Sequence, residues 1–157
     1  MANEHRVYLD HLIPRESLRL QRPEAQVTDP KMMHLSLQDL RDPVRSKFLR
    51  KPDFQRETWA WTPEDCVSLL ESLTNRQVIP SIIMWASADN GYEYILDGGH
   101  RVSVILAWMR DDWGDNLPKD QYRDDEHESM VKDAAREVRR LVNQRVGSIK
   151  DYEAAET

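Results

Sequence analysis

The chain contains a single cysteine, Cys66, so it cannot build an internal disulfide framework. It also lacks any run of about 18 apolar residues, the length that a membrane-spanning helix requires. The first residues do not form a charged segment followed by an apolar one, which is typical of a secretory leader. We therefore expect a cytoplasmic protein without a membrane partner.

Several motifs that bind cofactors are missing as well. Neither G-x-x-x-x-G-K-[ST] nor G-x-G-x-x-G occurs, which excludes the P-loop and the dinucleotide-binding fingerprint. The five histidines are scattered, no H-E-x-x-H occurs, and there is no pair of cysteines. We therefore expect no zinc site.

The length of 157 residues suits one domain with one core, because domains of about 100–150 residues are the commonest size. Charged residues make up 32% of the chain, a polar value for a compact protein, so we expect part of the length to lie outside the core. The two ends are the candidates. Residues 1–33 carry three prolines and show no sustained period, which predicts an extended N-terminal arm.

The net charge of −6 argues against indiscriminate binding to nucleic acid, because such affinity comes mainly from neutralising phosphates. The charge is unevenly distributed, however. From Lys31 to Arg56 there are seven basic and three acidic residues, whereas residues 111–128 are strongly acidic. The basic stretch from Arg41 to Arg56 could contact DNA, and a solvated surface is the alternative interpretation.

The apolar periods predict a fold that contains both helices and strands. A short strand that leads into a turn or brief helix is expected at residues 34–40. Thr62 and Pro63 have the residue types that begin a helix, and Val67, Leu70 and Leu73 continue it as an apolar stripe. Cys66 widens this stripe, so it is interpreted as a small buried hydrophobe.

Residues 82–86 and 92–96 are apolar and flank Asn90-Gly91, the strongest short hairpin signal, so they predict two antiparallel strands. The helix expected at 100–110 is apolar nearly all round and should be buried. A C-terminal helix is expected at 130–146, and the tail 151–157 should fray. We therefore divide the chain into an arm (1–33), a core (34–113), and a polar loop with a C-terminal helix (114–157).

The candidate site is the junction between the second of these strands and the buried helix, Asp97-Gly98-Gly99-His100-Arg101. Glycines allow a tight turn and a close approach to the backbone, and the helix offers unpaired N–H groups and the positive end of its dipole, a combination that suits phosphate. Gly98 and Gly99 would admit phosphates, which His100 and Arg101 would neutralise. Asp97 and His100 are the candidate catalytic residues, and Asp97 could hold Mg²⁺ together with nucleotide phosphates.

A second candidate segment is Phe54-Gln55-Arg56, which lies before two tryptophans. Gln55 and Arg56 supply amide and guanidinium donors that can hold a base edge or a phosphate. Alternatively, Arg56 forms a surface ion pair beside a core phenylalanine.

Three segments of the chain, in their order, resemble motifs of the ParB-like superfamily. They are Phe54-Gln55-Arg56, Val78-Ile79-Pro80 and Asp97-Gly98-Gly99-His100-Arg101. More narrowly, they resemble its restriction-associated branch, which has an F-Q-R segment and a D-G-Q-Q-R or D-G-Q-H-R motif. The resemblance implies a ParB/sulfiredoxin-like α+β fold for the core, with a small mixed sheet and packed helices. It also implies nucleotide phosphates at the G-x-x-R turn and, in some relatives, hydrolysis of a nucleoside triphosphate (NTP) linked to phage restriction.

The chain departs from this pattern in three ways. Gly99 stands where the family has its first glutamine, which could cost a side-chain contact. The turn lacks the cysteine of sulfiredoxins, so their sulfinic-acid chemistry is not expected. There is no motif for the HNH nuclease domain of larger relatives, so we expect any DNA cleavage to reside elsewhere.

Three hypotheses follow. In the first, the protein is a nucleotide-binding switch or an NTPase in an anti-phage or restriction-type system, with Gln55 and Arg56 completing the pocket. In the second, it is a DNA- or protein-binding module, for example a homodimer, that uses the same fold without nucleotide. In the third, Asp97 only caps the turn and Arg101 pairs with a neighbouring acid.

Overall fold

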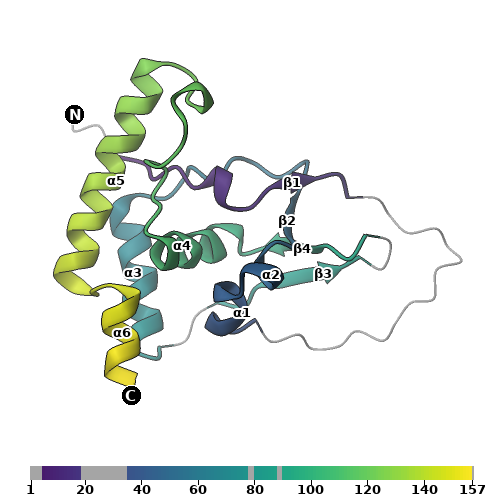
Figure 1. The fold of residues 1–157 in the computed structure, drawn as a ribbon, viewed down its shortest axis with the longest axis horizontal. Coiled ribbons are helices and arrows are strands. Elements are labelled where there is room, and N and C mark those ends of the chain that lie inside the picture. Colours follow the sequence, from purple (N-terminus) through teal and green to yellow (C-terminus); the bar gives the residue numbers. More distant parts are fainter. Residues whose placement is uncertain (1–4, 19–34, 78–79, 88–89, 157) are drawn as a thin grey trace, which may run out of the picture.

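The computed structural model describes residues 5–18, 35–77, 80–87 and 90–156 (Figure 1). Most of the expected arm, together with His34 and the Val78-Ile79 pair, lies outside these residues. The fold is α+β, as expected, with a small mixed sheet and several helices, one of them at the C-terminus.

The sheet has four strands in the order β1-β2-β4-β3. β1 runs parallel to β2, β2 runs parallel to β4, and β3 is antiparallel to β4. The two strands predicted from the Asn-Gly signal are therefore confirmed as β3 and β4, with Met84 opposite Ile95. The strands span β1 Arg15–Glu16, β2 Leu49–Pro52, β3 Ile83–Ala86 and β4 Glu93–Asp97.

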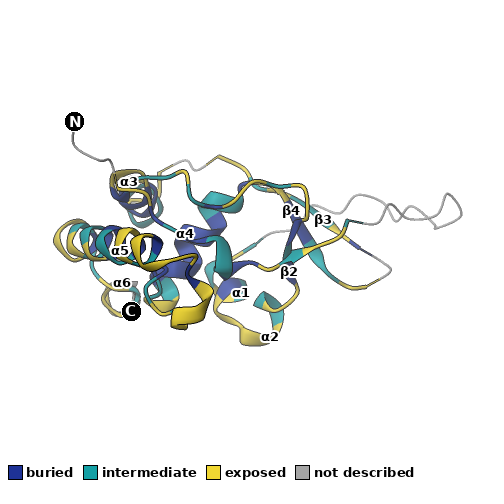
Figure 2. Ribbon diagram, turned by 90° about the horizontal axis from the view of Figure 1, so that it is seen from above, coloured by how far each residue is buried: buried dark blue, intermediate teal, exposed yellow. Residues whose placement is uncertain are grey.

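The predicted buried helix is α4 (Gly99–Arg110), and every residue from Val102 to Trp108 is buried. In Figures 1 and 2 it lies between the sheet and three other helices, α3 (Pro63–Thr74), α5 (Asp125–Arg145) and α6 (Ile149–Glu156). An apolar helix in this central position holds its own N-terminus rigidly, and that N-terminus is the candidate site.

Helix α3 begins as its sequence predicted. Thr62 accepts a hydrogen bond from the backbone N–H of Asp65, and the carboxylate of Asp65 accepts one from the N–H of Thr62, which completes a capping box. Cys66 is fully buried on the apolar face of α3, and burial raises the pKa of its thiol. Its interpretation as a core residue is confirmed.

The N-terminal segment is extended, as expected, with only the 3-10 turn η1 (Asp10–Leu12) and the two-residue strand β1. The expectation that this end lies outside the core was wrong for residues 5–18. Val7, Leu9, Leu12 and Ile13 are buried in the main core. Long-range packing of four apolar side chains outweighed the polar composition of the segment.

The C-terminal end also contributes to the fold. The predicted last helix begins earlier than expected, at Asp125, because Asp124 caps it and acidic residues suit its first turn. The expectation of a frayed tail was wrong for α6, where Ser148 and Asp151 exchange capping hydrogen bonds. Tyr152 of this helix packs against Trp108.

The segment before β2 is helical. The short strand expected near residue 35 is not formed by the described residues there, since Ser36 instead caps helix α1 (Leu37–Arg41). Helix α2 (Pro43–Ser46) follows, and η2 (Lys119–Gln121) is the remaining helical turn.

Within the described residues, no helix has the length and apolar character needed to cross a membrane.

Candidate functional site

The turn between β4 and α4 depends on one of its two glycines. Gly98 has a φ of +99°, in the left-handed region, and a Cβ there would lie 3.0 Å from Cγ1 of Ile82. A Cβ on Gly99 would meet only Oε1 of Gln55, at an ordinary 3.7 Å. Gly98 is therefore required by the backbone, whereas position 99 accepts a side chain.

The structure brings Gln55 to this turn, although 42 positions separate it from Asp97 in the sequence. Its Nε2 donates hydrogen bonds of 2.9 Å to the backbone carbonyls of Ile95 and Leu96 at the end of β4. Its Oε1 faces Gly99. Because the amide donor is engaged by two carbonyls, Gln55 presents an acceptor to the turn in this arrangement.

The neighbours of Gln55 behave differently. Phe54 is 71% exposed, so the alternative that placed it in the core is wrong. Arg56 is exposed too, and within the described part of the chain its side chain makes no ion pair. The structure therefore brings one of the two predicted polar residues of this segment to the turn.

Arg101 closes over the turn. Its Nη2 donates to the carbonyl of Ser81 at 3.0 Å and lies 3.6 Å from a carboxylate oxygen of Asp97. Its Nε is buried and has no hydrogen-bond partner among the described residues. The Asp97 side chain is 66% exposed. Arg101 therefore keeps one N–H that no described residue accepts, while Asp97 presents its carboxylate to solvent.

His100 stacks on Trp61, with ring centroids 5.5 Å apart and an interplanar angle of 20°. Burial, together with the positive charges of Lys51 and Arg101, lowers the pKa of His100, while Asp10 opposes this shift. The imidazole is therefore neutral at pH 7. Its Nε2 is buried and has no hydrogen-bond partner among the described residues.

A pocket of about 430 Å³ opens beside Arg101, between α3 and the N-terminus of α4. One aromatic ring, two hydroxyl groups and one carboxylate are available in it. Its lining residues are Trp61, Asp65, Ser68, Leu69, Ser72, Pro80 and Arg101.

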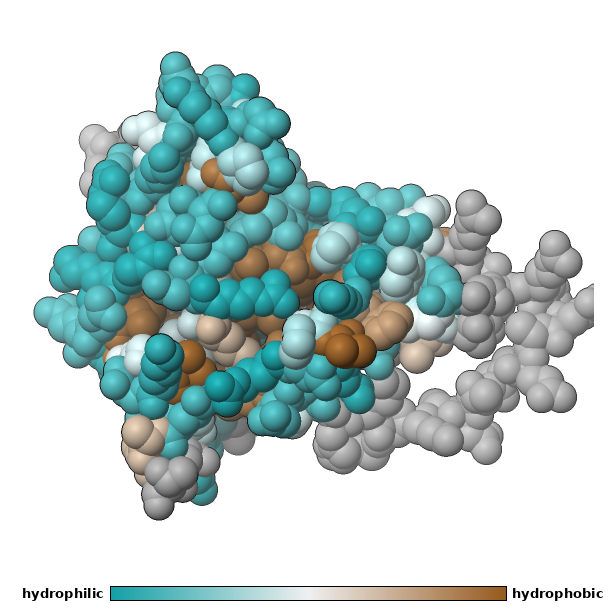
Figure 3. Space-filling model, viewed as in Figure 1, coloured by the Kyte–Doolittle hydropathy of each residue, from teal (hydrophilic) through white to brown (hydrophobic). Residues whose placement is uncertain are grey.

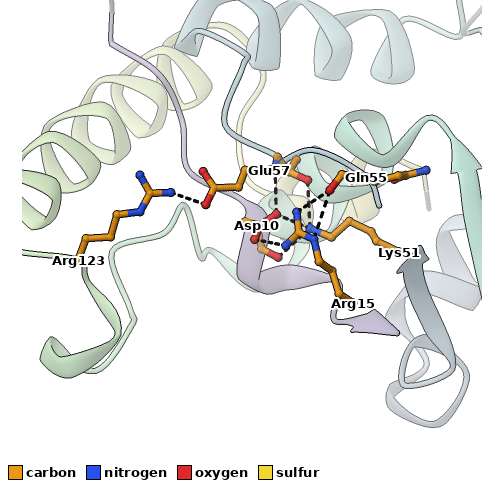
Figure 4. Close-up of polar contacts among 7 residues, drawn as sticks. Asp10, Arg15, Lys51, Gln55, Glu57 and Arg123 are labelled. Atoms are coloured by element: carbon orange, nitrogen blue, oxygen red, sulfur yellow. Dashed lines mark hydrogen bonds and ion pairs between the residues drawn. The ribbon is translucent and has the colours of Figure 1, made fainter. Parts of the chain in front are cut away.

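An ionic cluster around the buried Lys51 lies next to the Gln55 segment (Figure 4). Nζ of Lys51, whose side chain is 1% exposed, lies 2.7 Å from Oδ1 of Asp10 and 3.2 Å from Oγ1 of Thr58. Arg15 pairs with the other oxygen of Asp10 and donates to the backbone carbonyl of Gln55. The cluster thus fastens the Gln55 segment to the N-terminal segment.

Burial determines the pKa shift of one central charge of this cluster, and hydrogen bonding determines that of the other. Burial lowers the pKa of Lys51, and its hydrogen bond to Asp10 opposes the shift. Burial also works to raise the pKa of Asp10, but hydrogen bonds from Arg15 and Lys51 outweigh it and hold that pKa well below its usual range. Asp10 is therefore ionised throughout the physiological range.

Sequence reasoning did not identify the cluster. Asp10 and Arg15 lie in the segment interpreted as an arm, and Lys51 was counted with the surface charges. One signal was present, because Lys51 is two positions from Leu49 and so shares its inward face of β2. Its counter-ion could not be found, since Asp10 is 41 positions away.

The basic residues of the stretch predicted to contact DNA do not form one continuous surface in the structure. Lys51 is buried, and Arg45 forms ion pairs with Asp39 and Glu93. The side chains of Arg41, Lys47 and Arg50 line a groove on the surface.

These features define a small α+β domain with a polar turn at the N-terminus of its central helix. The family model described as the N-terminal domain of the GmrSD restriction endonuclease matches residues 37–156, most of the chain, and the chain belongs to this family. The restriction-associated family expected from the two motifs is thereby confirmed, while the wider ParB-like resemblance stays a prediction. Comparisons with curated proteins and with solved structures gave no match.

Proposed function

We propose that this domain binds a nucleoside triphosphate at the turn between β4 and α4 and serves a restriction-type defence against phage. The observation that carries the proposal is that two nitrogens in the first turn of α4, Nε of Arg101 and Nε2 of His100, have no hydrogen-bond partner among the described residues. The first N–H groups of a helix also lack intrahelical partners and suit phosphate oxygens. The family description, which names a restriction endonuclease, supports the setting.

Each residue of the turn then has a distinct task. Gly98 makes the tight turn, and Gly99, where a Cβ would meet only Oε1 of Gln55, lets the phosphates approach the backbone. Arg101 leaves the Ser81 carbonyl to bind them, and neutral His100 donates or accepts a proton at Nε2. Exposed Asp97 contributes the one carboxylate that a Mg²⁺ bound to phosphates requires. This assignment includes hydrolysis of the triphosphate, with Asp97 and His100 as its catalytic residues.

The nucleoside would occupy the pocket between α3 and α4. Arg101 belongs both to the lining of this pocket and to the turn, so one ligand can reach both. Trp61 offers an aromatic surface to the base, and the hydroxyl groups of Ser68 and Ser72 suit the ribose.

Calorimetric titration of ATP, GTP, CTP and UTP with Mg²⁺ tests the proposal. We expect Arg101→Ala to weaken binding about 10- to 150-fold, the equivalent of one charge-assisted contact of about 1.5–3 kcal/mol. Arg136→Ala is the matched control, because Arg136 lies on the exposed face of α5. Absence of binding by any nucleotide, or equal affinity in a folded Arg101→Ala variant, would refute the proposal.

Ser68→Trp separates the pocket from the turn. Filling the pocket should weaken nucleotide binding without changing the affinity for inorganic tripolyphosphate, which has no nucleoside. If nucleotide and tripolyphosphate bind equally well to the unaltered protein, the turn binds phosphate but the pocket does not hold the nucleoside.

The alternative function is a DNA- or protein-binding module without nucleotide. This alternative predicts that the calorimetric titration detects no binding of any of the four nucleotides. Measuring phosphate release from whichever nucleotide binds decides between an NTPase and a switch that only binds.

A further inference from the structure

A groove of about 730 Å³ lies at the opposite end of α4 from the turn. Its walls come from η1, from the helices α1 and α2, from β2, and from the C-terminal end of α4. In Figure 3 hydrophobic surface crosses the middle of this face between hydrophilic borders. The groove is lined by His11, Leu12, Pro14, Leu40, Arg41, Pro43, Ser46, Lys47, Arg50, Met109 and Arg110.

The lining of the groove is basic. It includes four arginine or lysine side chains and no aspartate or glutamate, although the whole chain has a net charge of −6. Segments distant in sequence contribute these charges, because Arg110 closes α4 whereas Lys47 and Arg50 flank the start of β2. A cationic surface on an acidic protein attracts anions selectively to that place.

Three of the four strong cations form no ion pair with the described residues. Within the described part of the chain, none of Lys47, Arg50 and Arg110 has a carboxylate within ion-pair distance. Arg50 donates to the backbone carbonyl of Leu49 and lies over the ring of Tyr92, and Arg110 donates to Oγ of Ser46.

The other two basic groups of the groove are engaged. Arg41 pairs with Glu153 of α6, and Nε2 of His11 lies 2.9 Å from the carboxylate of Asp112. Burial works to raise the pKa of Asp112, but the hydrogen bond with His11 outweighs it, and the charge of Arg110 adds to the lowering. Lys47 and Arg50 are therefore the groups most available to an anion, while Arg110 shares part of its charge with Asp112.

The remaining lining indicates what kind of anion fits. The floor contains leucine, proline and methionine side chains, and the groove is much larger than one phosphate group. Separate cations over an apolar floor suit a chain of phosphates linked by sugars, since contacts to phosphate and sugar hold a nucleic acid in position. We propose that this groove binds the sugar–phosphate backbone of DNA.

The groove and the nucleotide turn are separate sites. Helix α4 has 12 residues, so its ends are roughly 18 Å apart at about 1.5 Å per residue. DNA in the groove and a nucleotide at the turn can therefore be bound together. The two proposals can also fail independently.

The test uses the full chain, without nucleotide, and a fluorescently labelled 20-base-pair DNA duplex. The variant Lys47→Gln/Arg50→Gln/Arg110→Gln should lose affinity roughly tenfold or more at low salt. The slope of log Kobs against log salt should become shallower by about 0.9 for each phosphate that the variant no longer neutralises. The control Arg136→Gln/Arg140→Gln/Lys150→Gln removes the same charge from exposed positions of α5 and α6 and should leave both quantities unchanged.

Circular dichroism establishes that each variant is folded before binding is measured. Equal loss of affinity in the control, unchanged affinity in the groove variant, or no binding by the unaltered chain overturns the proposal. Displacement of the duplex by millimolar inorganic phosphate at constant ionic strength would identify a small-anion site instead. Tighter binding of an RNA duplex of the same sequence would equally overturn the assignment to DNA.

Discussion

The ammonium group of Lys51 lies 2.7 Å from a carboxylate oxygen of Asp10, although 41 positions separate the two residues. The Lys51 side chain is 1% exposed, so its charge is balanced inside the protein and not by water. Asp10 also accepts hydrogen bonds from Arg15 and from the backbone N–H of Thr58. One carboxylate therefore joins the N-terminal segment, β2 and the loop that carries Gln55.

We expect Asp10→Asn to lower the free energy of unfolding by about 3–5 kcal/mol, because it leaves a buried ammonium without its counter-ion. Urea unfolding measures the change. Asp53→Asn, at an exposed position, is the matched control and should have little effect. The double variant Asp10→Asn/Lys51→Met should be more stable than Asp10→Asn, and the idea fails if Asp10→Asn is as stable as the control.

The two glycines of the turn should respond in opposite directions to alanine. Gly98→Ala forces a Cβ onto a residue with a φ of +99° and to within 3.0 Å of Ile82, so we expect a loss of about 1–3 kcal/mol. Gly99→Ala replaces glycine in the first turn of a helix where the Cβ meets only an ordinary contact, and should gain about 0.5–1 kcal/mol. Thermal or urea unfolding of both variants checks this, and equal losses would contradict it.

Stability should decrease on mild acidification. Burial, Lys51 and Arg101 lower the pKa of His100, so the unfolded chain takes up this proton at a higher pH than the folded protein. The contribution of His100 to stability is fully present above its pKa of about 6.5 in the unfolded chain. It is lost as the pH falls toward its lower pKa in the folded protein. His100→Gln should therefore flatten the unfolding free energy between about pH 7.5 and about pH 5.

His127 contributes with the same sign, because burial and then Arg123 lower its pKa as well, so His100→Gln removes only part of the slope. His5→Gln, at an exposed position, serves as the control. An unchanged pH dependence in His100→Gln would show that His100 does not titrate differently in the two states.

Gln55→Glu tests the attachment of the Gln55 segment to β4. Glutamate has no N–H to donate and would place an oxygen against the carbonyls of Ile95 and Leu96, so we expect a loss of about 1–3 kcal/mol. Amide hydrogen exchange of residues 54–58 should become faster, since the segment loses its fastening. Gln121→Glu is an exposed counterpart, and equal exchange in the two variants would contradict this role.

Features of the fold with local causes were predictable. The capping residues Thr62 and Asp65 act within one helical turn, and the strands around Asn90-Gly91 pair across a short connection. Features that depend on distant partners were not predictable, as Lys51 and Phe54 illustrate. Lys51 is buried because Asp10 pairs with it, whereas Phe54 is exposed although its aromatic type favours a core.

For the candidate site, the sequence predicted the turn and the nearby position of Gln55. It did not predict which atoms of Gln55 face the turn and which are hydrogen-bonded to the protein. The hypothesis that Gln55 completes a pocket placed it near the turn, but the donor of Gln55 is directed at carbonyls of β4. Whether a side chain faces a ligand or the protein depends on a few ångströms of backbone position. Composition and spacing carry no information at that scale.

The buried N-terminal segment also decides where a fragment of this protein can be cut. The family match begins at residue 37, yet Val7, Leu9, Leu12 and Ile13 fill the core, and Asp10 balances Lys51. A fragment starting at residue 37 would uncover apolar surface and leave an unpaired charge beneath the Gln55 segment. The unit that folds therefore includes residues 5–18, which lie outside the matched range, and a fragment of this protein made for expression should retain them.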